Sequence, residues 1–202
     1  MKGADAVFPA SPALTLHDPL GELLGAGDGR YRYTFDDAVK LAGHACPTVA
    51  GGFLLVLGAV QRLYDSGEVP QRGGLRVTVH AAVDQGATGP LSQILTLLTG
   101  AAADNGFHGL AGRQVRHGLL RFVPDAAAGP LRCTFERADN GRRVTLAYDP
   151  SAIPPAAGMT ADMQAVLAGH ADAATTQRFR SAWRDRVERL LADGGRLTVT
   201  EA

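Results

Sequence analysis

The sequence predicts an α+β protein, because patterns typical of helices and patterns typical of strands both occur along the chain. Residues 47–64 open with a proline and continue as an apolar run, which predicts a buried helix, since proline is favoured at the first helical position. Residues 75–81 alternate apolar and polar side chains, as a strand with one buried face does. Residues 131–135 and 142–148 are joined through an Asn-Gly pair, which predicts an antiparallel hairpin.

The other elements are predicted from cap and turn residues. In residues 34–37 a hydroxyl is followed three positions later by an acid, which predicts the start of a helix that ends at Gly43. A glycine-proline pair precedes a second apolar helix, residues 91–98, and residues 115–123 predict a further strand. In the last part of the chain, apolar side chains recur at steps of three and four, which predicts helices followed by an edge strand at residues 197–200.

The length of the chain and its linker-like stretches suggest how it is divided. At 202 residues the chain is long enough for one core that needs no disulfide. Residues 150–158 contain several prolines and small residues, as a linker does. We expect an N-terminal extension at residues 1–30, an α+β core at residues 31–150, and a C-terminal helical extension at residues 151–202 that packs on the core.

The composition argues against several classes of protein. Twenty basic residues balance twenty acidic ones, so no overall charge attracts nucleic acid or an anionic membrane. The longest apolar run, residues 53–60, is too short to cross a bilayer, and the first residues carry Asp5 rather than the apolar run of a signal peptide. The two cysteines, Cys46 and Cys133, lie far apart, which suits a reducing compartment. We therefore expect a cytoplasmic protein that binds neither nucleic acid nor membranes.

The segment from His44 to Pro47 contains the most reactive pair of side chains. Pro47 places Cys46 at the N-cap of the long helix, where free N–H groups and the helix dipole stabilise a thiolate. His44 is close enough in sequence to share a metal ion with Cys46 or to exchange a proton with it. The spacing alone is a weak zinc signature, since structural zinc sites usually have four ligands in two close pairs. A single cysteine in apolar surroundings is also often a small buried side chain.

Two further histidines are candidates for a third metal ligand. His80 shares the polar face of its strand with Arg76 and Thr78, where it is either solvated or a ligand. His108 lies in a long glycine-rich loop, and such loops often carry function. Cys133 falls in the middle of a predicted strand and is expected to be buried packing.

Small residues on the long helix, among them Gly51, Gly52 and Gly58, predict close packing against another element. A homodimer is one way to cover this bare side, and it would let His108 of one protomer reach the His44–Cys46 pair of the other. The alternative is that the strands of the same chain cover it.

Several motifs, in the same order, resemble the FmdE-like family, which is named after a component of formylmethanofuran dehydrogenase, in its stand-alone bacterial branch. The resemblance covers about residues 30–125. The matching pieces are Gly43-His44-Ala45-Cys46-Pro47, the turn through Asp84 and Gly86, Leu98-Thr99-Gly100, and Gly106-Phe107-His108-Gly109-Leu110. Outside this region, Asp18-Pro19-Leu20 and Trp183 to Val187 also resemble that branch.

The resemblance implies an α+β fold with a mixed or antiparallel sheet flanked by helices, often dimeric. It also implies a transition metal, usually zinc, near the histidine and cysteine of the first motif. The chain departs from the family at Ala81 and Ala101, where many members have further cysteines, and it lacks the C-terminal zinc ribbon of some members. Any metal must therefore be held by histidine, carboxylate, water or a second protomer.

We therefore predict a zinc-type metal-binding protein with His44 and Cys46 as ligands and His80 or His108 as the third. Two alternatives stay open. One is a metal-free thiol enzyme that uses Cys46 and His44 as nucleophile and base. The other is a non-enzymatic module that binds a small ligand or a protein partner, in which the starts of the two apolar helices converge on a site with free N–H groups.

Overall fold

The computed structural model describes residues 7–124 and 129–201, and its centre is a mixed sheet of five strands. The strands lie in the order β4-β3-β5-β6-β7, with β3 and β4 parallel and the other neighbours antiparallel. Their bounds are Leu75–Val79 for β3, Leu120–Phe122 for β4, Leu131–Arg137 for β5, Arg143–Tyr148 for β6 and Leu197–Glu201 for β7. The predicted fold class, an α+β protein with a mixed sheet and helices, is confirmed.

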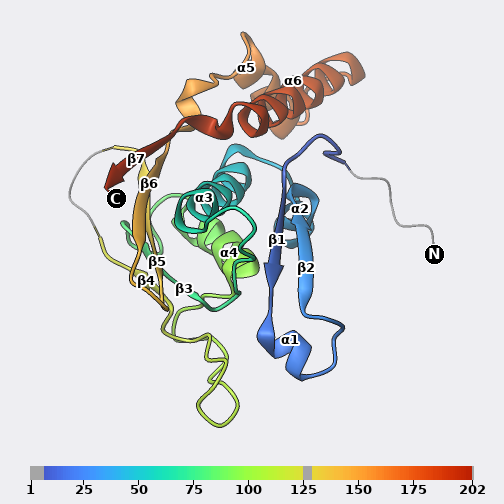
Figure 1. Cartoon of the computed structure of the whole chain (residues 1–202). Helices are drawn as coiled ribbons and strands as arrows, with labels where there is room; N and C mark the ends of the chain where they lie inside the picture. Colours follow the sequence, from blue (N-terminus) through green and yellow to red (C-terminus); the bar gives the residue numbers. More distant parts are fainter. Residues whose placement is uncertain (1–6, 125–128, 202) are drawn as a thin grey trace.

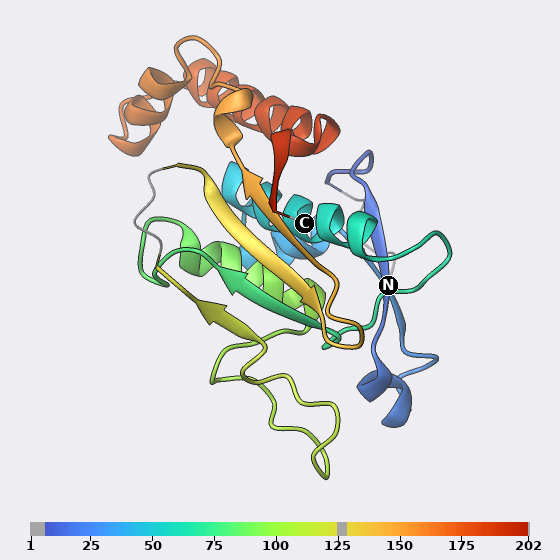
Figure 2. The same cartoon turned by 60° about the vertical axis from the view of Figure 1, so that its left-hand side comes forward.

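Helices pack on one face of this sheet, where α3 and α4 lie against it (Figure 1). In the described residues no helix covers the other face, which is turned towards the viewer in Figure 2. The bounds are Pro19–Leu23 for α1, Phe35–Ala42 for α2, Pro47–Leu63 for α3, Thr88–Thr99 for α4, Met159–Leu167 for α5 and Ala173–Ala192 for α6. None of these helices is long and apolar enough to cross a membrane.

The helix α3 is central because most of its side chains are buried between the sheet, α4 and the flanking elements. A Cβ at Gly52 would lie 2.9 Å from the Cβ of Ile94 in α4, and one at Gly51 would overlap the ring of Tyr148 in β6. The glycines thus let these elements approach closely, as predicted. The side of α3 that carries them is covered by the chain itself, so the expectation that a second protomer covers it is wrong at these positions.

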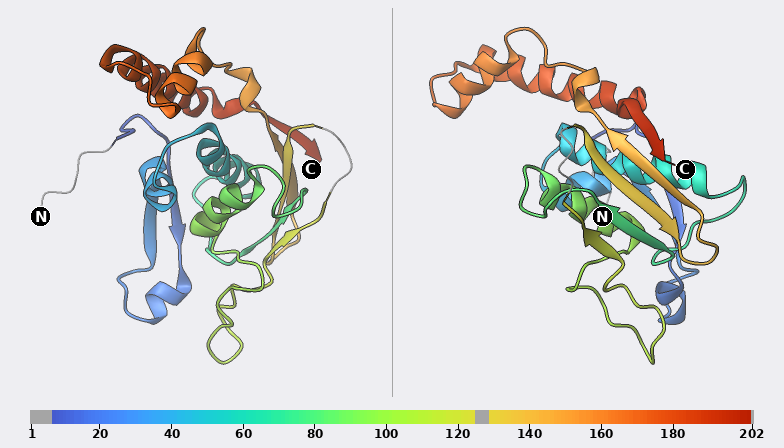
Figure 3. Two further views of the ribbon diagram at one scale, coloured as in Figure 1. Left: turned by 180° about the vertical axis from the view of Figure 1, so that it is seen from behind. Right: turned by 90° about the vertical axis from the view of Figure 1, so that its left-hand side faces the viewer.

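The two ends of the chain are built into the fold. Strand β1, Ala13–His17, pairs with β2, Arg30–Thr34, and buries Leu14 and Leu16 in the core. At the other end, α5 and α6 lie side by side, and β7 extends the sheet (Figure 3). The residues expected to form an N-terminal extension therefore include a strand of the fold, and residues 1–6 lie outside the described part.

Two predicted elements have different bounds. Helix α4 begins at Thr88, three residues earlier than predicted, and the strand predicted at residues 115–123 is reduced to β4. The reason for the second difference is a loop contact, since the N–H groups of Arg116 and His117 both donate to the carbonyl oxygen of Phe107. Residues 115–119 thus belong to a protruding loop that points away from α5 and α6 (Figures 1 and 3).

Candidate functional site

The site predicted from the sequence lies at the junction of α2 and α3. Helix α2 begins with the predicted capping box of Thr34 and Asp37 and ends at Gly43, whose φ of 75° closes the helix in the left-handed region. The chain then passes through His44 to Cys46, the N-cap of α3. Local cap chemistry therefore delivers the imidazole and the thiol to the start of the central helix, as predicted.

The ring of His44 is exposed, and its Nδ1 lies 3.0 Å from the carbonyl oxygen of Ala42. A carbonyl oxygen only accepts, so this contact places the proton of the neutral ring on Nδ1. Nε2 then carries the free lone pair. The backbone hydrogen bond thus selects the tautomer whose outer nitrogen is able to bind a metal or a proton.

Cys46 is half-buried, and in the described residues its side chain makes no hydrogen bond. The peptides on either side of it are held by two aromatic side chains. Trp183 of α6 donates from Nε1 to the carbonyl oxygen of Ala45 at 2.8 Å, and Tyr148 of β6 donates from its hydroxyl to that of Pro47 at 2.8 Å. Burial raises the pKa of Tyr148, so the hydroxyl stays a donor at neutral pH.

His80 lies on the opposite side of the sheet from this junction. Its Nε2 is 2.8 Å from the hydroxyl of Thr134 in β5. The residues that precede these two in their strands, Val79 and Cys133, are fully buried under the helices, and side chains alternate along a strand. The backbone of the sheet therefore separates the His80 ring from α3.

His108 lies in the protruding loop, where its ring stacks on His117 with centroids 4.2 Å apart. In the described part of the chain, no group of three or more His, Cys, Asp and Glu side chains is placed so that it could hold a metal ion. The structure thus brings His44 and Cys46 together at one helix start, and it does not add His80 or His108 to them. Cys133 is buried, as predicted, and burial raises the pKa of its thiol to about 12.

Two hollows flank the start of α4. The smaller, about 400 Å³, lies between the starts of α3 and α4 and the end of β6, and Thr48, Leu91 and Tyr148 line it. The larger, about 690 Å³, runs along the other side of α4 past Leu41 and Phe122. None of the four predicted ligands lines either hollow. The smaller one is nearer the junction in sequence and contacts, because Thr48 follows Cys46 by two residues and Tyr148 also binds Pro47.

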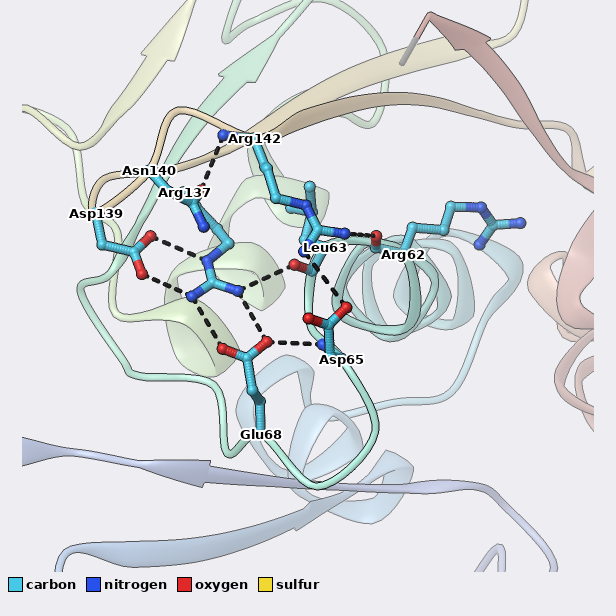
Figure 4. Close-up of polar contacts among 8 residues, drawn as sticks. All are labelled: Arg62, Leu63, Asp65, Glu68, Arg137, Asp139, Asn140 and Arg142. Atoms are coloured by element: carbon cyan, nitrogen blue, oxygen red, sulfur yellow. Dashed lines mark hydrogen bonds and ion pairs between the residues drawn. The ribbon is translucent and has the colours of Figure 1, made fainter.

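Sequence reasoning missed two clusters of charged residues that hold the fold together. In one, the carboxylate of Asp18 accepts from Arg72 at 2.5 Å and from Arg116 at 2.7 Å, both largely buried. In the other, Arg137 donates to Glu68, to Asp139 and to the last carbonyl of α3 (Figure 4). No local pattern marks these residues, since most of their partners are distant in the sequence.

The fold and the junction define an α+β protein with an imidazole and a thiol at the start of its central helix. No protein-family model, no curated protein and no solved structure matches this chain. The likeness to the FmdE-like family therefore stays a prediction from the motifs.

Proposed function

We propose that this protein binds a transition metal of the zinc type, with His44 Nε2 and the Cys46 thiolate as ligands at the start of α3. The observation that carries the proposal is the hydrogen bond between His44 Nδ1 and Ala42, which leaves Nε2 unprotonated on an exposed ring. Histidines that bind metals commonly donate their other N–H to a backbone carbonyl or a carboxylate in this way.

The position of Cys46 also supports the proposal. A thiolate at a helix N-terminus is stabilised by the dipole and by N–H groups of the first turn, and the thiol of Cys46 makes no competing hydrogen bond in the described residues. One nitrogen and one sulfur ligand suit Zn²⁺ better than Mg²⁺ or Ca²⁺, which prefer oxygen.

Two protein ligands leave coordination positions for water, a small ligand or a donor from a second protomer. We therefore propose a homodimer as the source of any further protein ligand, with His108 on its protruding loop as the candidate and His80 as the less accessible one. The resemblance to the FmdE-like family supports both the metal and the dimer.

The test is metal retention after reconstitution with zinc and desalting, measured by elemental analysis. Wild type is expected to keep about one zinc per chain, and His44→Ala and Cys46→Ser are expected to lose it. His170→Ala is the matched control, because His170 is an exposed histidine between α5 and α6, away from the junction. The proposal is wrong if wild type retains no metal, or if His44→Ala retains as much as wild type. His108→Ala and His80→Ala then test the third ligand.

The metal-free thiol enzyme is disfavoured by one observation. In the described residues no hydrogen bond joins the two side chains, since His44 contacts Ala42 and Cys46 has no partner. A nucleophile and its base need such a contact, directly or through water. Titration of thiolate absorbance in metal-free protein separates the two functions, because thiol catalysis requires a thiolate that forms well below the free-thiol value of about 8.5.

A further inference from the structure

The hollow of about 400 Å³ beside the junction has the size of a small-molecule site and walls that are already in place. Tyr148 forms part of the wall, and its hydroxyl is fixed by Pro47 while its ring packs against Gly51. Leu91 forms another part and is 2% exposed. Since both side chains are held by the core, a ligand would meet a preformed apolar surface.

The polar groups at this hollow come from two uncapped helix starts. Cys46 is the N-cap of α3 and Ala87 that of α4, and neither side chain accepts a hydrogen bond from its first turn. In contrast, Asp172 caps α6 through the N–H of Thr175. First-turn N–H groups have no carbonyl to reach within their own helix, so those of α3 and α4 are available to an acceptor.

A buried hydroxyl adds an independent indication of a ligand. Thr88, the first residue of α4, is 3% exposed, and its hydroxyl makes no hydrogen bond within the described residues. The hydroxyl of Thr48, which lines the hollow, is likewise unpaired there. Because buried hydroxyls almost always have partners, two unpaired ones beside uncapped helix starts indicate that an acceptor is missing.

The charges at the rim restrict what this acceptor is. No Lys or Arg lines the hollow within the described residues, and Asp149 lies at its edge. Hydrogen bonds from Ser151 lower the pKa of Asp149, so this carboxyl is ionised at neutral pH. A dianion such as phosphate would be repelled without a compensating cation, whereas a single carboxylate meets less repulsion and has an apolar chain to bury.

We propose that this hollow binds a short-chain aliphatic monocarboxylate, whose oxygens accept hydrogen bonds from the starts of α3 and α4 and whose chain packs against Leu91, Leu131 and Tyr148. The proposal deepens the proposed function, because it assigns the ligand class beside the His44–Cys46 pair. It rests on that function for its role only, since the binding groups belong to the protein and not to the metal.

The test uses metal-free protein titrated with hexanoate and followed by amide NMR. Binding is expected at about millimolar concentration, with shifts at Thr48, Val49 and Gly89. Hexanamide, which lacks the charge, and inorganic phosphate are expected to bind at least tenfold more weakly. Ala87→Trp fills the rim from an exposed position and is expected to weaken hexanoate at least tenfold, whereas Ala161→Trp, exposed on α5, leaves it unchanged.

Several results would overturn the proposal: no shift at these amides, equal binding of hexanamide or phosphate, or full affinity in Ala87→Trp. Thr48→Val provides a second variant that keeps the side-chain shape, and about fivefold weaker binding is expected from the lost hydroxyl. Since all titrations use metal-free protein, they succeed or fail independently of zinc retention. A protein that binds hexanoate and retains no zinc would keep this site and refute the metal.

Discussion

Replacing Asp18 by Asn is expected to remove the charge that holds two buried arginines. The carboxylate accepts from Arg72 Nη1 and Arg116 Nη2, and Arg116 is 7% exposed with no partner for its Nη1 in the described residues. Asp18 is also the N-cap of α1, where its oxygen accepts from Leu20 and Gly21. Asparagine caps about as well as aspartate, so the substitution isolates the lost charge from the cap.

The expected loss is about 3–5 kcal/mol of unfolding free energy, because removing one partner leaves buried charges without compensation. For a chain of this size, that loss lowers the Tm by about 10 °C or more. Chemical denaturation monitored by circular dichroism measures the free energy. Asp185→Asn is the matched control, since Asp185 pairs with Arg189 on the surface of α6 and such pairs contribute about 0–1 kcal/mol. If Asp18→Asn loses no more than Asp185→Asn, the buried cluster does not stabilise the fold.

The pH dependence checks the same reasoning. Burial raises the pKa of Asp18, but the charges of Arg116 and Arg72 and the N–H donors of Leu20 and Gly21 outweigh burial and hold it below its ordinary value of 3.8. A carboxyl whose pKa is lower in the folded state stabilises that state above its unfolded pKa and ceases to do so as pH falls through the folded value. The difference between wild type and Asp18→Asn is therefore expected to be constant from about pH 5 to 7 and to shrink below about pH 4.

Three further predictions follow from single contacts. Gly73→Ala would place a Cβ on the guanidinium of Arg116 at a φ of 78°, and is expected to cost about 2 kcal/mol or more, measured by denaturation; an unchanged free energy would contradict this packing. Tyr148→Phe removes one hydrogen bond at the start of α3 and is expected to cost about 1 kcal/mol, whereas a gain in stability would show that the bond does not form. Alkylation by iodoacetamide at pH 8, read by mass spectrometry, is expected at Cys46 only, because Cys133 is buried with a pKa of about 12; labelling of Cys133 in folded protein would count against its burial.

The elements that the sequence predicts well are those with local signals. Pro47 and the capping box at residues 34–37 define the starts of α3 and α2, and the Asn-Gly pair marks the turn between β5 and β6. The pairing of β1 with β2 and the cluster around Asp18 are not predicted, because they depend on residues far apart in the chain. Arg72 and Arg116 follow Asp18 by 54 and 98 residues, and no short pattern connects them.

The candidate site divides in the same way. The helix start at His44 and Cys46 is a local feature, and the structure places it as expected. The third ligand depends on tertiary placement, and His80 illustrates how much the alternation of its strand already implies. Residues 75–79 alternate with their apolar side chains facing inward, so His80 faces away from any helix that covers that side. The parity of the strand, combined with the packing of α3 on the inward face, therefore excludes His80 from a ligand set that includes Cys46 of the same chain.

The chain has one tryptophan, and it lies where the proposed metal would be felt. Trp183 donates to the carbonyl oxygen of Ala45, the residue between the two proposed ligands. A metal held by His44 and Cys46 would fix the backbone of Ala45 and change the polarity at the indole N–H, and both affect its emission. Zinc titration is therefore expected to change the fluorescence of wild type in a saturable way and to leave His44→Ala and Cys46→Ser unchanged, with His170→Ala behaving as wild type. Equal changes in wild type and His44→Ala would mean that zinc acts elsewhere, whereas retention of one zinc with no change in emission would place the metal away from the start of α3.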